Sequence, residues 1–297
     1  MRTWYTVMFI ASVAVLALSI AALVMYGLNF GVDFTGGSVL EVEYAANRPS
    51  ADQLTTILGD SKDPIVRNSS FTLVGDQGVI FRSSDRTVGA QEGIMGVLTA
   101  ASPDATITQR HFDFIGPSIG EELKSKSLRG IVILLVLVLL YIAWMFRTLK
   151  RSLSLWAMAA GTVVSLAHDI VIPLGLFAVL GHFKGVEISA VFVAAILTIL
   201  GYTVSDKVVI YDRVRENILR GSRDPLPEIV HKSVMQTLVR SINNTLVVML
   251  SSLAVFLFGG ESIRYFALAL MVGIGLGAYS SIFVASPLLV WLSKRGR

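Results

Sequence analysis

The chain has 297 residues, of which 54% are hydrophobic and only 15% are charged, and its mean hydropathy is +0.68. Because soluble proteins carry about 25% charged residues, this composition indicates a membrane protein. The absence of cysteine excludes disulfides, thiol catalysis and thiolate metal sites. The net charge of +4 does not indicate nucleic-acid binding, because the sequence has no stripe of basic residues interleaved with aromatic residues.

Six segments are long and apolar enough to cross a membrane as helices, which takes about 20 residues each. The first apolar run is too long for a cleaved signal peptide, so residues 1–28 are expected to remain as an anchor. Residues 129–297 then hold the other five helices. The predicted spans are 5–27, 129–147, 153–179, 187–211, 234–258 and 265–291.

Basic residues set the expected orientation, because Lys and Arg are enriched in short cytoplasmic loops. One set of span ends holds most of them, whereas the opposite short loops hold only Lys184 and Arg264. We therefore expect both termini and a loop at about 212–233 in the cytoplasm, and residues 29–128 on the outer face. The basic set comprises Arg2, Arg147, Lys150, Arg151, Arg213, Arg215, Arg220, Arg223, Lys232, Lys294, Arg295 and Arg297.

The outer segment, residues 29–128, has the pattern of a small α+β domain. Its predicted order, β-α-β-β-α-β, is that of a ferredoxin-like fold, and about 100 residues can bury a core of their own. The predicted strands are 38–44, 64–74, 77–82 and 104–112, with a hairpin turn at 75–78, and the predicted helices are 51–58, capped by Ser50, and 89–100.

The stretch VDFTGG joins the first span to the first strand. Gly36 and Gly37 permit a sharp turn or a close backbone approach, and Asp33 can brace the turn. A turn is the simplest interpretation of these residues together with Phe34.

Charged residues inside the fourth and fifth spans should mark a function, because each costs about 2.5–3.5 kcal/mol at the centre of a membrane helix. At 1.5 Å per residue, about 28 Å separates Glu187 from Asp206 and about 27 Å separates Phe258 from Arg240. In antiparallel helices the two charges lie at nearly the same depth, so an Asp206–Arg240 ion pair is geometrically allowed.

The spacing of Arg240, Asn243, Asn244 and Val247 places them on one helix face, which we expect to point into the bundle. The pair can be a static link that sets helix register. It can also be a proton relay, because a nearby Arg favours the charged carboxylate whereas desolvation favours the neutral acid. A local contact of Asp206 with Arg213 is a further alternative, and Lys207, about 100° away, is expected to snorkel to the surface.

The third span contains His168 and Asp169 just before Pro173. These two ionisable groups either extend a proton path or form a hydrogen-bonded core pair. In the sixth span, Gly273 and Gly277 form a small-residue face that predicts close helix packing. The sequence contains no recognisable hydrolase, nucleotide-binding or metal-site motif, so we expect neither an enzyme nor a bound cofactor or metal, and the energy source would be a gradient.

Six motifs are spread along the chain: VDFTGG, FIGPSIGEEL, AHDI, GYTVSDKVVIYDRVREN, RSINNTL and YSSIFVASPLL. Together they resemble the SecF proteins of the SecD/SecF protein-export family, within the resistance-nodulation-division superfamily, over essentially the whole chain. The resemblance implies a six-helix bacterial inner-membrane protein with a ferredoxin-like periplasmic domain at 29–128. It also implies pairing with SecD, docking near the SecYEG channel, and inward proton flow that helps draw unfolded preprotein across, with other Sec accessory membrane proteins as candidate partners.

The family's membrane carboxylate and the arginine of the next span fall on Asp206 and Arg240, so the resemblance implies a proton relay there. The chain departs from the family pattern at Ser205, Lys207 and Asn244. A lysine next to Asp206 would change the pH at which Asp206 exchanges protons. The VDFTGG stretch would then also couple the anchor helix to the outer domain. A membrane scaffold that transduces no energy, or half of a proton-coupled small-solute exporter, remains as an alternative.

Overall fold

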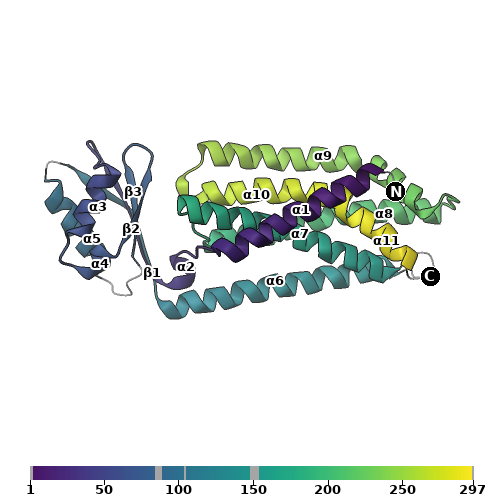
Figure 1. Cartoon of the computed structure of the whole chain (residues 1–297), viewed down its shortest axis with the longest axis horizontal. Coiled ribbons are helices and arrows are strands. Elements are labelled where there is room, and N and C mark those ends of the chain that lie inside the picture. The colour runs from purple at the N-terminus through teal and green to yellow at the C-terminus, as the bar shows by residue number, and fades with distance from the viewer. Residues whose placement is uncertain (1–2, 84–88, 104, 148–153, 296–297) are drawn as a thin grey trace. The chain divides into compact units, whose positions relative to one another are not determined.

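The computed structural model describes residues 3–83, 89–103, 105–147 and 154–295 (Figure 1). It divides into two compact units, one made of residues 1–29 and 129–297 and the other of residues 30–128. Within the described ranges, six helices are long and apolar enough to cross a membrane, which confirms the predicted number. They are α1 (Thr3–Tyr26), α6 (Pro117–Met145), α7 (Leu155–Lys184), α8 (Ala190–Leu219), α9 (Leu226–Phe258) and the continuous run of α10 (Glu261–Ser280), η2 (Ser281–Ala285) and α11 (Ser286–Arg295).

Three of these helices form the interior of the helical bundle. About half of the most apolar stretch of α7, α8 and the α10 run is buried, against 11% for α1 and α6 and 17% for α9. Ionisable residues within the apolar stretches of α7 and α8, such as Asp169 and Lys207, therefore lie inside the bundle, whereas α1, α6 and α9 present broad faces to lipid or to a partner.

The interior helices pack closely at glycines. A Cβ added at Gly277 of α10 would lie 2.7 Å from Thr203 Cβ of α8, and one added at Gly273 would lie 2.7 Å from Ile199 Cγ1. The small-residue face predicted from the sequence is thus confirmed, and it fixes how α8 lies against α10. After Ser280 a single turn of π-helix, η2, which packs against α1, α7 and α8, leads into α11.

The predicted loop at 212–233 is largely helical. Helix α8 continues to Leu219 and α9 begins at Leu226, so only residues 220–225 connect them. Ion pairs along α8 support this extension, joining Arg213 to Glu216 at 2.6 Å and Glu216 to Arg220 at 2.5 Å. Of the basic residues that set the expected orientation, Arg2, Lys150, Arg151 and Arg297 lie outside the described residues.

The unit of residues 30–128 contains a four-stranded antiparallel sheet in the order β2-β3-β1-β4. Together with the helices between the strands, it confirms the predicted α+β domain after the first span. Its elements are α2 (Val32–Thr35), β1 (Gly37–Tyr44), α3 (Ala51–Gly59), α4 (Pro64–Arg67), β2 (Ser70–Val74), β3 (Gly78–Ser83), α5 (Ala90–Ala101) and β4 (Ile107–Ile115).

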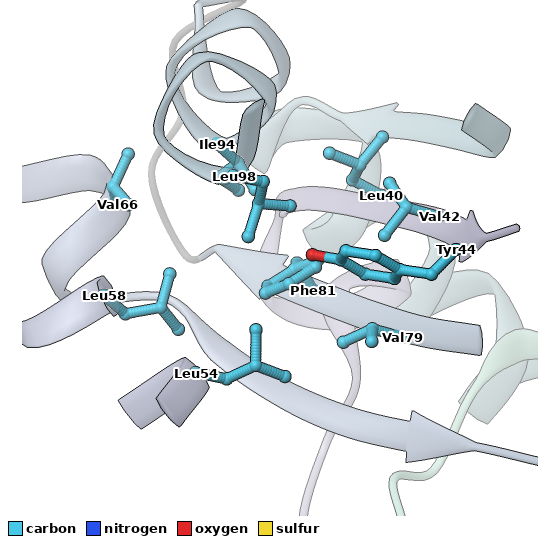
Figure 2. Close-up of a cluster of buried hydrophobic side chains, with 10 residues drawn as sticks. All are labelled: Leu40, Val42, Tyr44, Leu54, Leu58, Val66, Val79, Phe81, Ile94 and Leu98. Carbon is cyan, nitrogen blue, oxygen red and sulfur yellow. The ribbon is translucent and has the colours of Figure 1, made fainter. Parts of the chain in front are cut away.

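The core of this domain lies between the sheet and its helices (Figure 2). Alternate residues of β1 point to one face of the sheet, and residues four apart on α3 and on α5 cover it. Burial of this face explains why the period-2 and period-3.6 patterns were readable in the sequence. The core residues are Leu40, Val42, Tyr44, Leu54, Leu58, Val66, Val79, Phe81, Ile94 and Leu98.

Two predictions in this domain need correction. Residues 64–67 form the short helix α4 rather than the start of a strand, because Pro64 suits the first turn of a helix and the Asp63 side chain accepts a hydrogen bond from the Ile65 amide at 2.9 Å. The last strand runs from Ile107 to Ile115 rather than over 104–112, and residue 104 lies outside the described residues. The Ser50 cap is confirmed, with Gln53 completing a capping box.

The VDFTGG stretch forms α2 and the start of β1. Gly36 and Gly37 have φ values of 76° and 137°, which side chains rarely adopt, so the turn requires glycine at both positions. Gly37 pairs with Ile115, the last residue of β4, so the strands that lead into and out of the domain are neighbours. On α6, Gly120 has no side chain to clash with Phe34, whose carbonyl oxygen would lie 3.0 Å from an added Cβ.

Candidate functional site

Two consecutive residues of α8, Asp206 and Lys207, lie inside the helical bundle. Asp206 is 7% exposed and Lys207 is 0% exposed. Because successive helix positions differ by about 100°, the two side chains point to different neighbours. Asp206 points toward Ser241 of α9, and Lys207 points toward Asp169 of α7.

Asp206 lies in a polar but incompletely hydrogen-bonded region between α8 and α9. Among the described residues, its Oδ2 atom has no hydrogen-bond partner although it is buried, and the same holds for Ser241 Oγ beside it. One helical turn away, Tyr202 lies next to Thr245, whose Oγ1 is also buried without a hydrogen-bond partner in the described part of the chain. Buried polar groups without hydrogen-bond partners are energetically costly, so this region is a candidate functional site.

Lys207 forms a buried ion pair, so the expectation that it snorkels to the surface is wrong. Its Nζ atom lies 2.7 Å from Asp169 Oδ2, both side chains are 0% exposed, and Nζ also donates to the Thr203 carbonyl oxygen at 3.3 Å. This pair joins α7 to α8 in the centre of the bundle.

His168 extends the polar contacts of Asp169 toward α1. His168 Nδ1 lies 3.2 Å from Asp169 Oδ1, and the imidazole stacks on Tyr279 of α10 at an interplanar angle of 20°. The Tyr279 hydroxyl donates to the Met8 carbonyl oxygen at 2.8 Å and accepts from Ser12 Oγ at 3.1 Å. The structure thus links His168 and Asp169, which are adjacent in sequence, to three other helices.

The polar face predicted on α9 does not point into this chain's own bundle. Arg240, Asn243 and Asn244 are exposed, and Val247 is 64% exposed. Within the described ranges, no ion pair joins Arg240 to Asp206, and Arg213 pairs with Glu216 rather than with Asp206. The predicted depth was nevertheless right, because the residue beside Asp206 is Ser241, the neighbour of Arg240 in sequence.

The buried face of α9 is made of small hydroxyl residues. Thr237, Ser241 and Thr245 recur every four residues and are at most 6% exposed. Their spacing in the sequence was the signal that could have identified this face, because small side chains allow membrane helices to approach closely.

The residues of the VDFTGG stretch lie together at the start of the domain formed by residues 30–128. Asp33 is in the first turn of α2, and the Phe34 ring packs edge-on against Phe30 with the ring centroids 5.8 Å apart. Over the part of the chain that the structure describes, no group of three or more His, Asp or Glu residues is placed to hold a metal ion.

Two protein-family models match this chain, one near its N-terminus and one over its C-terminal two thirds. The model described as "Protein export membrane protein SecD/SecF, C-terminal" matches residues 97–295, and the model described as "SecD/SecF GG Motif" matches residues 21–47. The second match contains the VDFTGG stretch, and the first contains His168, Asp169, Asp206 and Lys207.

Individual relatives agree with this assignment. The protein translocase subunit SecF of Haemophilus influenzae is 36% identical over 283 residues, covering 93% of this chain and 81% of the relative. SecF of Vibrio alginolyticus is 35% identical over 295 residues, covering 97% and 88%. The subunit SecDF of Brucella abortus is 35% identical over 293 residues, covering 96% of this chain but 36% of that longer relative.

A solved structure has the same fold. The crystal structure of SecDF, a translocon-associated membrane protein from Thermus thermophilus, matches all of this chain with a TM-score of 0.84 and 29% sequence identity, over 39% of that chain. The fold, the motif matches and the relatives agree along nearly the full length. The chain therefore belongs to the SecD/SecF family of protein-export membrane proteins, as a multi-pass SecF member and a component of protein transport.

Proposed function

We propose that this chain uses the proton-motive force to assist preprotein translocation, and that Asp206 is the group that takes up and releases the proton. The observation that carries this proposal is the buried Asp206 carboxylate, whose Oδ2 atom has no hydrogen-bond partner among the described residues. A carboxylate in that position changes its interactions strongly when it gains or loses a proton.

Protonation would act through the contact between α8 and α9. The neutral acid can donate a hydrogen bond to a neighbouring hydroxyl such as Ser241 Oγ, whereas the carboxylate can only accept one. Each proton that crosses the membrane releases about 2.3 kcal/mol per 100 mV, which is enough to shift a two-state equilibrium of a few kcal/mol. Uptake on one side and release on the other would therefore alternate the packing of α8 against α9.

SecD is the proposed partner of the exposed α9 face. The SecDF relatives are longer chains in which the matched part occupies little more than a third, and we assign the remainder to a SecD-like half. Arg240, Asn243 and Asn244 lie on an otherwise apolar exposed face, where polar groups in a membrane helix are expected to meet a partner. In the assembled complex Arg240 would then contribute to the relay from the partner side.

The outer domain is proposed to lie in the periplasm and both termini in the cytoplasm, with the SecYEG channel and unfolded preprotein as further partners. Movement of the helices would reach the domain through Asp33, Phe34, Gly36 and Gly37. The close approach of Phe34 to Gly120 supports this role, because it packs the joint against the start of α6.

The test is preprotein export with and without a proton gradient, in vesicles that contain SecD and either the wild-type chain or Asp206→Asn at matched levels. Asp212→Asn is the control, because Asp212 lies on the same helix with a side chain that is 47% exposed. We expect Asp206→Asn, but not Asp212→Asn, to abolish the gradient-dependent part of export. Unchanged export by an assembled Asp206→Asn complex would reject the proposal in favour of a scaffold role.

A further inference from the structure

Among the described residues, two carboxylates, Asp169 and Asp206, are buried in the bundle, and their surroundings differ. Asp169 has a partner at each oxygen, with Lys207 Nζ 2.7 Å from Oδ2 and His168 Nδ1 3.2 Å from Oδ1, and Ser280 also lies beside it. Asp206 Oδ2, in contrast, has no hydrogen-bond partner among the described residues. Within this part of the chain, the hydrogen-bonding needs of Asp169 are met, whereas those of Asp206 are not.

The charges of Asp169 and Lys207 balance each other. Both side chains are 0% exposed, so neither charge reaches solvent. If Asp169 were protonated, the Lys207 ammonium would remain as an unpaired buried charge, and breaking a buried ion pair from one side in this way is strongly unfavourable. A proton that reaches this region therefore has a better acceptor in Asp206.

Among the described residues, no other Lys, Arg, Asp or Glu side chain forms an ion pair with Asp169 or Lys207. From α7 the titratable neighbour is His168, from α8 it is Asp206, and α10 contributes the hydroxyls of Tyr279 and Ser280. The apolar run of α1 contains no charged residue between Thr3 and Tyr26. In the described part of the chain, the Lys207 ammonium thus lies near two carboxylates, Asp169 and Asp206, and it contacts only Asp169 directly.

We propose that Lys207 is a positioning residue that forms a charge-neutral link with Asp169, holds α7 against α8, and keeps Asp169 out of proton exchange so that Asp206 is the single exchanging carboxylate. The inference rests on the proposed role of Asp206 in proton coupling, and it adds that the proton path does not pass through Asp169. Loss of the ammonium would convert Asp169 into a second proton acceptor.

The first test counts protonated carboxyl groups by infrared absorption of the purified full chain. The variants are Lys207→Met, which keeps an unbranched side chain one atom shorter and removes its charge, and the double variant Lys207→Met/Asp169→Asn, which has no charge at either position. We expect Lys207→Met to show one protonated carboxyl more than the wild type and the double variant to lose that extra signal. An unchanged spectrum in Lys207→Met would overturn the inference.

The second test is gradient-dependent export by the double variant, which should fold even if Lys207→Met does not accumulate, because no charge is left unpaired. We expect it to retain this export within about twofold of the wild type, since neutral replacement of a buried ion pair is tolerated. Loss of export in an assembled double-variant complex would show that the pair conducts protons and would overturn the inference. The infrared result does not depend on export, so a failure of the Asp206 proposal can be told apart from a failure of this one.

Discussion

Substitution of Gly277 by Ala tests the close packing that positions Asp206. The added Cβ would lie 2.7 Å from Thr203 Cβ and nearer still to its methyl carbon, so α10 and α8 must move apart. Overpacking of this kind costs about 1–3 kcal/mol, which is a factor of roughly 5 to 140 in an equilibrium constant. Because Thr203 lies one turn from Asp206, the separation should be felt at the site.

Hydrogen exchange measured by mass spectrometry on the full chain can localise this effect. Gly277→Ala should raise exchange in α8 and α10 by the factor given above, whereas Gly201→Ala, on α8 with nothing within 4 Å of its added Cβ, should leave exchange unchanged or slow it. Gly275→Ala should be intermediate, because the atom it meets is the flexible Met249 Sδ at 3.2 Å. Equal exchange in the Gly277 and Gly201 variants would show that the helices do not pack as described.

Two further predictions concern the outer domain. The Tyr44 hydroxyl is buried with no hydrogen-bond partner among the described residues, so Tyr44→Phe should raise the stability of the domain by about 1 kcal/mol. Burial also raises the pKa of Tyr44 above its ordinary value, so its contribution is complete below about pH 10 and is lost as the pH rises through the folded-state pKa. Cleavage of the full chain by an alkaline-tolerant protease should therefore accelerate above about pH 10 in the wild type more than in Tyr44→Phe, and identical profiles would contradict this. Gly36→Ala should destabilise the start of β1 by about 1–3 kcal/mol because φ is 76° there, as faster amide exchange at Gly37 would show, whereas Gly89→Ala, at a φ of −82°, should have little effect.

The outer domain could be predicted well because its elements are short and amphipathic. Leu40, Val42 and Tyr44 alternate on one face of a strand, and Leu54 and Leu58 lie one turn apart on a helix, so burial leaves a readable pattern. The local exception was Pro64, where capping by Asp63 prevails over a run that reads as a strand.

The rotation of α9 could not be predicted in the same way. A membrane helix is apolar on nearly all sides, and a polar face on it can meet either its own chain or a partner. Arg240 and Asn244 carry the stronger polar signal, but the small side chains of Ser241 and Thr245 are the ones that fit against α8. The sequence periodicity identifies the faces of this helix, but it does not show which face packs inside the bundle.

The sequence predicts a surface position for Lys207 because the apolar run ends near this residue, whereas the buried part of α8 extends past it. Helix α8 continues for about 18 Å beyond Lys207 to Leu219, and the Lys207 side chain is 0% exposed, so its ammonium points into the bundle rather than out to the surface. Its partner Asp169 is 38 positions away, and only the packing of α7 against α8 brings the two charges together.

The pairing of Gly37 with Ile115 has a mechanical consequence. The chain enters and leaves the outer domain at the same end of two neighbouring antiparallel strands. If the start of β1 and the end of β4 are displaced together, no force acts across the hydrogen bonds between the two strands. If one is pulled away from the other, these hydrogen bonds would break one after another from Gly37 onward. If the helices move the domain as proposed, α1 and α6 must therefore move in step, because a difference between their movements would pull β1 away from β4.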